Sequence, residues 1–393
     1  MLNRLGFRMS DINTCRVLSI DGGGERGIIP NTFMQLFVQQ WGINANEIWK
    51  YFDVITGSSI GGILASAYSY GLGLSDISSF FTTDGPWIFT TDSNNPSVTP
   101  STLSKINTII GGPLSNPTFY PSDVSGIGTM RLNTKLTSVF GTSTLQNLKT
   151  NTVITSFEKN DNNPEFSQNT NTPVYFSNSN IVPILQGQNN TIVDVAMSTS
   201  AAPLYFNPWS IGTNKYIDGG VTQNNPASFG LSIAKALKPT ANRFCVLSLG
   251  TGLGDIGFPP ATVMTKAKKE IAELNANPEL FAYKYKLSTP QLEELRQLGN
   301  NLKVLEGANL IMYLLGAMTT GPQEITAQDL NIRANYTLEN LYEYRLQYYL
   351  DSSVDTELDN TTTTATDYYT DSVTTYFNTD NQNISTFLGH LTA

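Results

Sequence analysis

The chain has 393 residues, of which 40% are hydrophobic and 14% are charged. Its 23 lysine and arginine residues face 32 aspartate and glutamate residues, and this net charge of −9 argues against a nucleic-acid partner. Two cysteines, Cys15 and Cys245, are too few for a disulfide scaffold or a cysteine-rich zinc module. The single histidine, His390, excludes a metal site with several histidine ligands, so catalysis must run nearly or wholly without imidazole.

Short apolar runs alternate with helical patterns through the first two thirds of the chain. We expect strands at residues 16–20, 51–56, 151–157 and 243–249, and helices from about residue 28, at 61–70 and at 225–237. The first two strands end in glycine-rich turns that lead into apolar helices. This repetition predicts an α/β fold with a largely parallel sheet, whose functional site lies at the carboxyl ends of the strands.

Other segments predict covering structure. Residues 82–125 are rich in proline and indicate loops, and residues 351–380 are rich in Thr, Asp and Asn and indicate surface structure or a partly flexible tail. Residues 262–318 predict helices that carry clustered positive charge, either as solvated faces or as a membrane-facing cap. The apolar stretch at 308–318 is too short to cross a bilayer and favours a buried helix.

The first glycine-rich turn is ambiguous by itself. Gly22, Gly24 and Gly27 form a Gly-x-Gly-x-x-Gly pattern after a strand and before a helix, which is the dinucleotide-binding fingerprint. The acidic residue about 20 positions later would be Glu47, which is not at the end of a strand. A phosphate cradle and an oxyanion hole both need free backbone N–H groups at a helix N-terminus, so nucleotide binding, acyl transfer and a plain structural turn remain open at this point.

The second turn favours acyl transfer. Gly57, Ser59 and Gly61 form a Gly-x-Ser-x-Gly pattern between a strand and an apolar helix. A nucleophilic serine must project from a sharp, strained turn, and flanking glycines let the strand and helix approach each other. The alternative is a turn serine that caps a helix.

A serine nucleophile requires a general base, and two candidates exist. His390 follows Ser59 in the chain order of an α/β-hydrolase, but it lies three residues from the last residue in a polar stretch. Asp218 ends a short strand and precedes Gly219 and Gly220, so it also projects from a tight turn. Burial would raise the pKa of this carboxyl and make it a better base, so we expect Asp218 to lie in a desolvated pocket beside Ser59.

The chain resembles the patatin-like phospholipases, and within them the plant patatin branch. The resemblance rests on the ordered motifs Asp21–Gly27 (DGGGERG), Gly57–Gly61 (GSSIG) and Asp218–Gly220 (DGG), and on connecting segments such as Ser198–Phe206 and Leu247–Gly252. Tyr344–Gln347 (YRLQ) is similar as well. The resemblance implies a three-layer α/β/α sandwich and a lipid acyl hydrolase.

Residue roles follow from the same resemblance. It implies that Ser59 is the nucleophile, that Asp218 is the base and that Arg26 holds the glycine loop. The oxyanion-hole donors would be Gly22, Gly23 and Gly24, with Ile60 as a further donor, and the supporting glycines would be Gly57, Gly61, Gly219 and Gly220. No metal or cofactor is implied, and the expected partner is a phospholipid or other acyl lipid at a membrane or micelle surface.

We expect an N-terminal extension at 1–13, a catalytic core at 14–258, a helical insertion or cap at 259–320 and a C-terminal part of the same domain at 321–393. The sequence shows no recognisable signal peptide, which favours a cytoplasmic or peripheral membrane protein and is compatible with a delivered effector. Two alternatives remain: an esterase that uses His390 in a Ser-His-Asp triad, and a catalytically weak lipid-binding or storage protein on the same scaffold.

Overall fold

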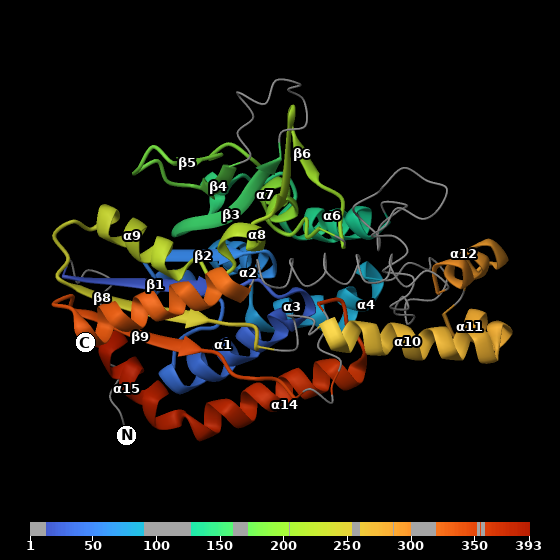
Figure 1. Ribbon diagram of the computed structural model, residues 1–393. Coiled ribbons are helices and arrows are strands. Elements are labelled where there is room, and N and C mark those ends of the chain that lie inside the picture. Colours follow the sequence, from blue (N-terminus) through green and yellow to red (C-terminus); the bar gives the residue numbers. More distant parts are fainter. Residues whose placement is uncertain are drawn as a thin grey trace.

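A mostly parallel sheet forms the centre of the protein in the computed structural model, which describes residues 13–89, 127–159, 172–203, 205–253, 260–285, 287–299, 320–351, 354 and 358–393 (Figure 1). The strands are β1 (Thr14–Ile20), β2 (Val54–Ser58), β3 (Asn151–Lys159), β4 (Thr172–Ser177), β5 (Leu185–Gln186), β6 (Trp209–Ile211), β7 (Asn214–Asp218), β8 (Arg243–Leu249) and β9 (Leu341–Leu346). Their order is β5-β4-β3-β2-β1-β8-β9, with β7 paired to β3 and β6 paired to β7. Parallel pairing joins β3, β2, β1, β8 and β9, while β4 and β7 run antiparallel to β3.

Alternate residues of the central strands enter two different cores, which explains why these strands are apolar on both faces. Val17 of β1 and Val54 of β2 face α9 (Ala227–Leu237) and the helix at 320–336, while Leu18 and Ile55 face the larger core on the other side. The larger core packs against α1 (Ile28–Trp41), α2 (Ile60–Tyr70), α7 (Ile192–Thr199), α14 (Thr363–Thr379) and α15 (Asn381–Thr392). Helices on both faces of a mostly parallel sheet confirm the predicted α/β class (Figure 1).

The remaining helical elements are short or lie outside this sandwich. They are η1 (Gly24–Gly27), η2 (Ile48–Lys50), α3 (Leu74–Ser79), η3 (Phe80–Asp84), α4 (Gly85–Ile88), α6 (Ile127–Phe140), η5 (Leu145–Asn147), α8 (Gly220–Gln223), α10 (Pro260–Ala276), α11 (Pro278–Tyr285) and α12 (Thr289–Gly299). Helices α10 to α12 extend away from the sheet (Figure 1). No helix among the described residues combines the length and the apolar character needed to cross a bilayer.

The predicted tail at 351–380 is wrong for its second half, because α14 is a long helix of the core. Its buried side chains Ala365, Tyr369, Val373 and Phe377 recur every four residues and cover α1. The high content of Thr and Asp conceals this stripe, since all of those residues except the buried Thr366 lie at partly or fully exposed positions. Likewise, η3 and α4 make residues 82–88 helical where loops were expected, while residues 90–126 lie outside the described part of the chain.

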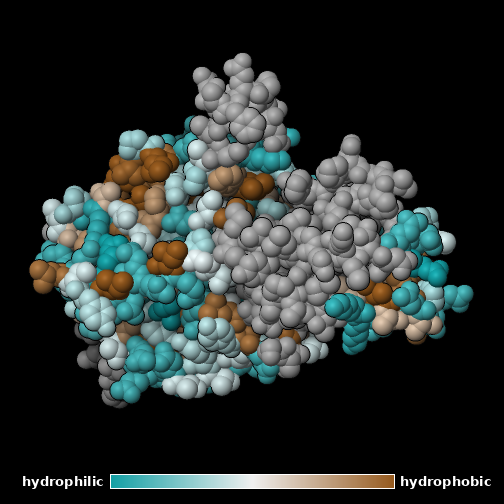
Figure 2. Space-filling view, viewed as in Figure 1, coloured by the Kyte–Doolittle hydropathy of each residue, from teal (hydrophilic) through white to brown (hydrophobic). Residues whose placement is uncertain are grey.

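The charge of α10 to α12 is mixed rather than uniformly positive. Lys284 forms an ion pair with Glu273 at 2.9 Å, and Arg296 lies 3.9 Å from Glu293. On the described part of the face in Figure 2, hydrophobic side chains form several separate patches with hydrophilic side chains between them. The apolar stretch at 308–318 lies outside the described residues, so the expectation of a buried helix there stays a prediction.

Candidate active site

Ser59 occupies a sharp turn between β2 and α2. Its backbone angles of φ 54° and ψ −127° make it the sole residue other than glycine with a positive φ among the described residues. Such a conformation is strained for an L-residue and persists where the surrounding structure enforces it. Here the Ser59 N–H donates to Thr199 Oγ1 at 2.8 Å, and its carbonyl accepts from Gly62 N–H at 2.9 Å. The turn therefore presents the half-buried Ser59 side chain at the N-terminus of α2, where the helix dipole favours negative charge.

The flanking glycines make this turn possible by close backbone contact. A Cβ atom at Gly57 would lie 2.0 Å from the Gly61 carbonyl oxygen, and one at Gly61 would lie 2.2 Å from the Ile20 carbonyl oxygen. Neither position has room for a larger residue, because the obstructing atoms belong to the backbone. The spacing read from the sequence thus has a direct steric cause in the packing of α2 against β1 and β2.

Asp218 reaches Ser59 from a different part of the sheet. It is the last residue of β7, where it pairs with Ser156 of β3, and its own N–H donates to the Ala201 carbonyl at 3.0 Å. Gly219 N–H donates to the Thr199 carbonyl at 3.2 Å, so Thr199 holds the turns of both Ser59 and Asp218. This shared contact fixes the Ser59 and Asp218 turns relative to each other.

The Asp218 carboxyl lies in a desolvated position. Its side chain is almost completely buried, and this burial raises its pKa from 3.8 to about 7. Hydrogen bonds from the Ser59 side chain and from Gly220 N–H, the latter at 2.6 Å, favour the carboxylate and partly offset that rise in pKa. A carboxyl with a pKa near 7 is a suitable general base at neutral pH, and it contacts the one hydroxyl that the strained turn presents.

The glycine loop after β1 lies directly against Ser59. A Cβ atom at Gly22 would be 2.9 Å from Ser59 Cβ. However, Gly22 N–H donates to the Asn224 carbonyl at 3.2 Å, so it is already used inside the protein. The N–H groups of Gly23, Gly24 and Ile60 have no hydrogen-bond partner within the described part of the chain, and they are the donors that remain for an oxyanion.

Two buried charged groups anchor this loop. Arg26 donates from Nε to the Gly23 carbonyl and from a terminal nitrogen to the Gly252 carbonyl, both at 3.3 Å, which are contacts that hold the loop in place. Asp21 is fully buried and receives two hydrogen bonds from Arg345 of β9, at 3.0 and 2.6 Å. Strand β9, which contains the first three residues of YRLQ, is therefore joined to the start of the glycine motif.

His390 lies near the amino ends of the parallel strands, whereas Ser59 lies at their carboxyl ends. Its ring stacks on Tyr342 with 3.9 Å between centroids, and its Nδ1 is 3.3 Å from Arg243, the first residue of β8. Ser59 follows the other end of the parallel strands, about 20 Å away for six residues at roughly 3.3 Å each. The triad alternative with His390 as base is therefore wrong on geometric grounds.

Glu47, the acidic residue that dinucleotide binding would require, is not near the glycine loop. Glu47 forms an ion pair with Lys50 just before β2 begins, at the sheet edge opposite the glycine loop. Among the described residues there is no group of three or more His, Cys, Asp or Glu side chains that could hold a metal ion.

Several contacts of the site were not anticipated from sequence. Thr199 supports the Ser59 and Asp218 turns, and Asn224 and Thr251 support the glycine loop, but nothing in their spacing along the sequence identifies these contacts. Gln323 donates to Asp21 at 2.7 Å and comes from a segment without a recognisable motif. Such contacts depend on tertiary packing between distant parts of the chain.

Comparisons with known proteins show which family this chain resembles. A family model described as patatin-like phospholipase matches residues 18–230. The chain is 29% identical over 226 residues to a cGAMP-activated phospholipase of Vibrio cholerae, with 56% of this chain and 57% of the relative covered. It is 31% identical over 268 residues to patatin-17 of Solanum cardiophyllum and 30% identical over 269 residues to patatin-like protein 1 of Oryza sativa subsp. indica. These matches cover 60% of this chain, and 60% and 58% of the two plant relatives respectively.

The chain thus spans somewhat under two thirds of the length of these relatives. The family match contains the glycine loop, Ser59 and Asp218, and it covers more than half of the chain. The chain therefore belongs to the patatin-like phospholipase family.

Proposed function

We propose that this protein is a lipid acyl hydrolase of the phospholipase A type, which cleaves carboxylic ester bonds through Ser59 and Asp218. The observation that carries the proposal is the buried Asp218 carboxyl, with a pKa raised to about 7, in contact with a serine held at φ 54°. Neither feature stabilises the fold, because a buried carboxyl and a strained turn both cost free energy. Their coincidence favours a catalytic role over a storage or binding role on the same scaffold.

The reaction would begin with attack of Ser59 Oγ on the ester carbonyl while Asp218 accepts the hydroxyl proton. The tetrahedral oxyanion would receive hydrogen bonds from Gly23, Gly24 and Ile60, whose N–H groups are free among the described residues. Gly22 would shape the loop without acting as a donor. One such donor typically contributes about 2.7–4 kcal/mol of transition-state stabilisation.

Breakdown of the tetrahedral intermediate would release the alcohol and leave an acyl group on Ser59. Protonated Asp218 would supply the proton that the departing alkoxide needs. A water molecule, deprotonated by the same carboxylate, would then attack the acyl-enzyme and release the fatty acid. All required groups come from the chain itself, so we expect turnover to survive EDTA.

The test is a lipidomic incubation of the full chain with phospholipids that carry a different acyl chain at each position. The wild type is expected to release free fatty acid, while Ser59→Ala and Asp218→Asn should lose at least about 1,000-fold in rate. The ratio of the two released acids gives the positional preference, and vesicles compared with monomeric short-chain lipids reveal dependence on a lipid surface. Unchanged hydrolysis in either variant would refute the dyad.

A further inference from the structure

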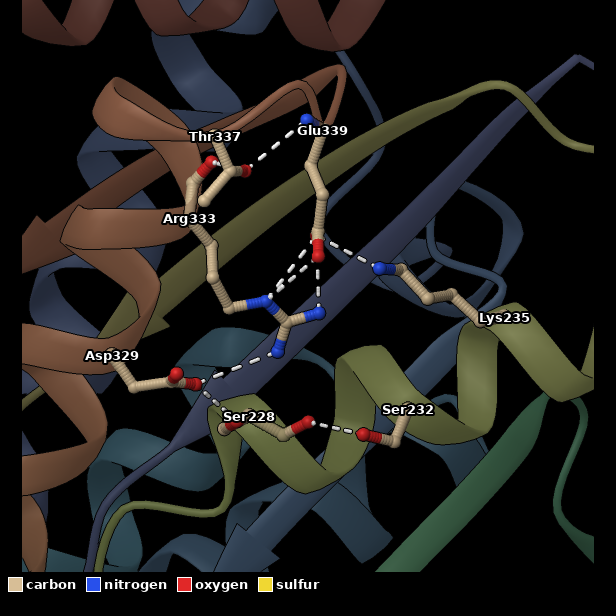
Figure 3. A network of polar contacts seen from close by, with 7 residues as sticks. All are labelled: Ser228, Ser232, Lys235, Asp329, Arg333, Thr337 and Glu339. Carbon is tan, nitrogen blue, oxygen red and sulfur yellow. Dashed lines mark hydrogen bonds and ion pairs between the residues drawn. The ribbon is translucent and has the colours of Figure 1, made fainter.

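The helix at 320–336 lies beside α9 on one face of the sheet, and a network of polar contacts joins the two helices (Figure 3). Arg333 binds Glu339 through hydrogen bonds of 3.1 to 3.2 Å, and Glu339 also forms a 2.8 Å ion pair with Lys235 of α9. Asp329 accepts a 2.8 Å hydrogen bond from Ser228, at the beginning of α9. These contacts hold the helix in place where it runs beside the sheet.

Close to the first described residue of this helix, Gln323 lies against the residues that support the glycine loop. Gln323 is almost completely buried, and both ends of its amide are used. Its Nε2 donates to Asp21 Oδ2 at 2.7 Å, and its Oε1 accepts from Asn224 Nδ2 at 3.2 Å. Gln323, which lies 18 residues before β9, therefore links Asp21 to Asn224. Asp21 is the residue before the glycine loop, and Asn224 is the residue that binds the loop.

Asn224 in turn holds both polar groups of Gly22. Its carbonyl accepts from Gly22 N–H at 3.2 Å, and its Nδ2 donates to the Gly22 carbonyl at 3.3 Å. Thr251 Oγ1 donates to the same carbonyl at 2.8 Å. Asn224 Nδ2 thus donates to both the Gly22 carbonyl and Gln323 Oε1. The hydrogen bond to Gln323 fixes the orientation of the Asn224 amide.

The orientation of the Gly22 carbonyl determines the orientation of the Gly23 N–H. The two groups belong to one planar trans peptide, so they point in opposite directions. Because Asn224 and Thr251 hold the carbonyl on the buried side, the Gly23 N–H is directed away from them, and it has no partner among the described residues. A rotation of the Asn224 amide would allow this peptide to turn and would misdirect the donor.

We propose that Gln323 is a positioning residue for the oxyanion-binding peptide of Gly22 and Gly23, and that it acts through Asn224 and Asp21. This inference rests on the proposed hydrolase function and adds to it a residue outside the segment that matches the family model. It assigns a role in catalysis to the helix at 320–336, which otherwise contributes only a covering layer.

Gln323→Leu removes both contacts while keeping a side chain of similar size. We expect kcat for a soluble ester to fall roughly 10- to 100-fold with KM within about twofold, because a misdirected donor weakens transition-state binding more than substrate binding. Gln328→Leu is the matched control, since Gln328 is an exposed glutamine on the same helix. The proposal is overturned if kcat of Gln323→Leu stays within twofold of the wild type. It is also overturned if the loss of activity equals the loss of folded protein.

Gln323→Glu tests the geometry through pH. A protonated glutamic acid can donate to Asp21 and accept from Asn224 as glutamine does, whereas a glutamate loses the donor and faces the Asp21 carboxylate. The charged groups around this position are Asp21, Arg345 and Glu324. We expect the activity ratio of Gln323→Glu to wild type to lie near one at pH 5.5 and to fall at least tenfold by pH 8.5, whereas Gln328→Glu should give a flat ratio. A flat ratio for Gln323→Glu contradicts the proposal.

A stability readout separates this inference from the proposed function. If the wild type shows no hydrolysis that depends on Ser59, the proposed function fails. The link between Gln323 and Asn224 is then decided by a double-mutant cycle of Gln323→Leu and Asn224→Ala in thermal unfolding, which requires no turnover. Coupled positioning predicts that the double variant loses less in Tm than the two single losses added together, and strictly additive losses overturn the link.

Discussion

Replacement of Asp218 by asparagine should make the protein more stable while it abolishes activity. The folded state raises the pKa of this carboxyl from 3.8 to about 7. Above pH 7 the folded protein must therefore hold a buried carboxylate, which the unfolded chain holds in water at lower free energy. Asparagine can still accept the hydrogen bond from Gly220, but it carries no charge at any pH.

The magnitude follows from the two pKa values. Each pH unit between them corresponds to about 1.4 kcal/mol, so the carboxyl lowers the free energy of unfolding by about 4 kcal/mol once the pH exceeds 7. Protonated Asp218 favours the folded state, and this stabilisation is complete below pH 3.8. It is lost progressively as the pH rises to about 7. With an unfolding entropy of about 2 cal/mol/K per residue, the 393-residue chain should gain about 5 °C in Tm at pH 8.

Differential scanning calorimetry between pH 4 and pH 9 measures this effect. The difference in Tm between Asp218→Asn and wild type should be close to zero at pH 4 and should reach a plateau above pH 7. Asp371→Asn is the control, because Asp371 is an exposed carboxylate on α14. A difference that is constant with pH, or a less stable Asp218→Asn protein at pH 8, would refute the argument that burial sets the pKa of Asp218.

The base, the strained turn and the histidine can each be tested by a pH profile or a single substitution. Since Asp218 must be deprotonated to accept a proton, log kcat/KM should rise with pH and level off above about 7, and a plateau that begins near pH 4 would contradict the raised pKa. Gly61→Ala places a Cβ atom 2.2 Å from the Ile20 carbonyl oxygen, so it should cost about 1–3 kcal/mol in urea unfolding and most of the activity. Gly389→Ala, with no atom near its Cβ position, should be neutral or stabilising. His390→Ala should keep kcat within about twofold, and a larger loss per folded molecule would revive the triad.

Much of the fold could be predicted because its signals are local. The strands β1, β2, β3 and β8 are apolar on both faces, and the glycines at their ends mark the turns. The candidate nucleophile and base could be located for the same reason, since each lies in a short motif at the end of a strand. In these segments the same physical requirement determines both the residue pattern and the position of the segment in the folded protein.

The rest depends on packing between distant segments. The helix α14 was missed because its buried stripe is interrupted by threonine and aspartate on the outer face. The N–H of Gly22 could be identified as a used donor only when the Asn224 carbonyl was seen beside it. Gln323 lies 302 residues from Asp21, and no pattern near it indicates the contact.

In the proposed mechanism, Ser59 becomes acylated while Asp218 acts as its base. Rapid-quench kinetics with a chromogenic acyl ester, followed by mass spectrometry of the quenched protein, test it most directly. The wild type and Ser58→Ala are expected to release one equivalent of alcohol in a burst and to carry the acyl group on Ser59. Ser59→Ala should show no burst, and Asp218→Asn should acylate at least about 1,000-fold more slowly. An acyl group on any other residue, or a normal burst in Ser59→Ala, would show that Ser59 is not the nucleophile.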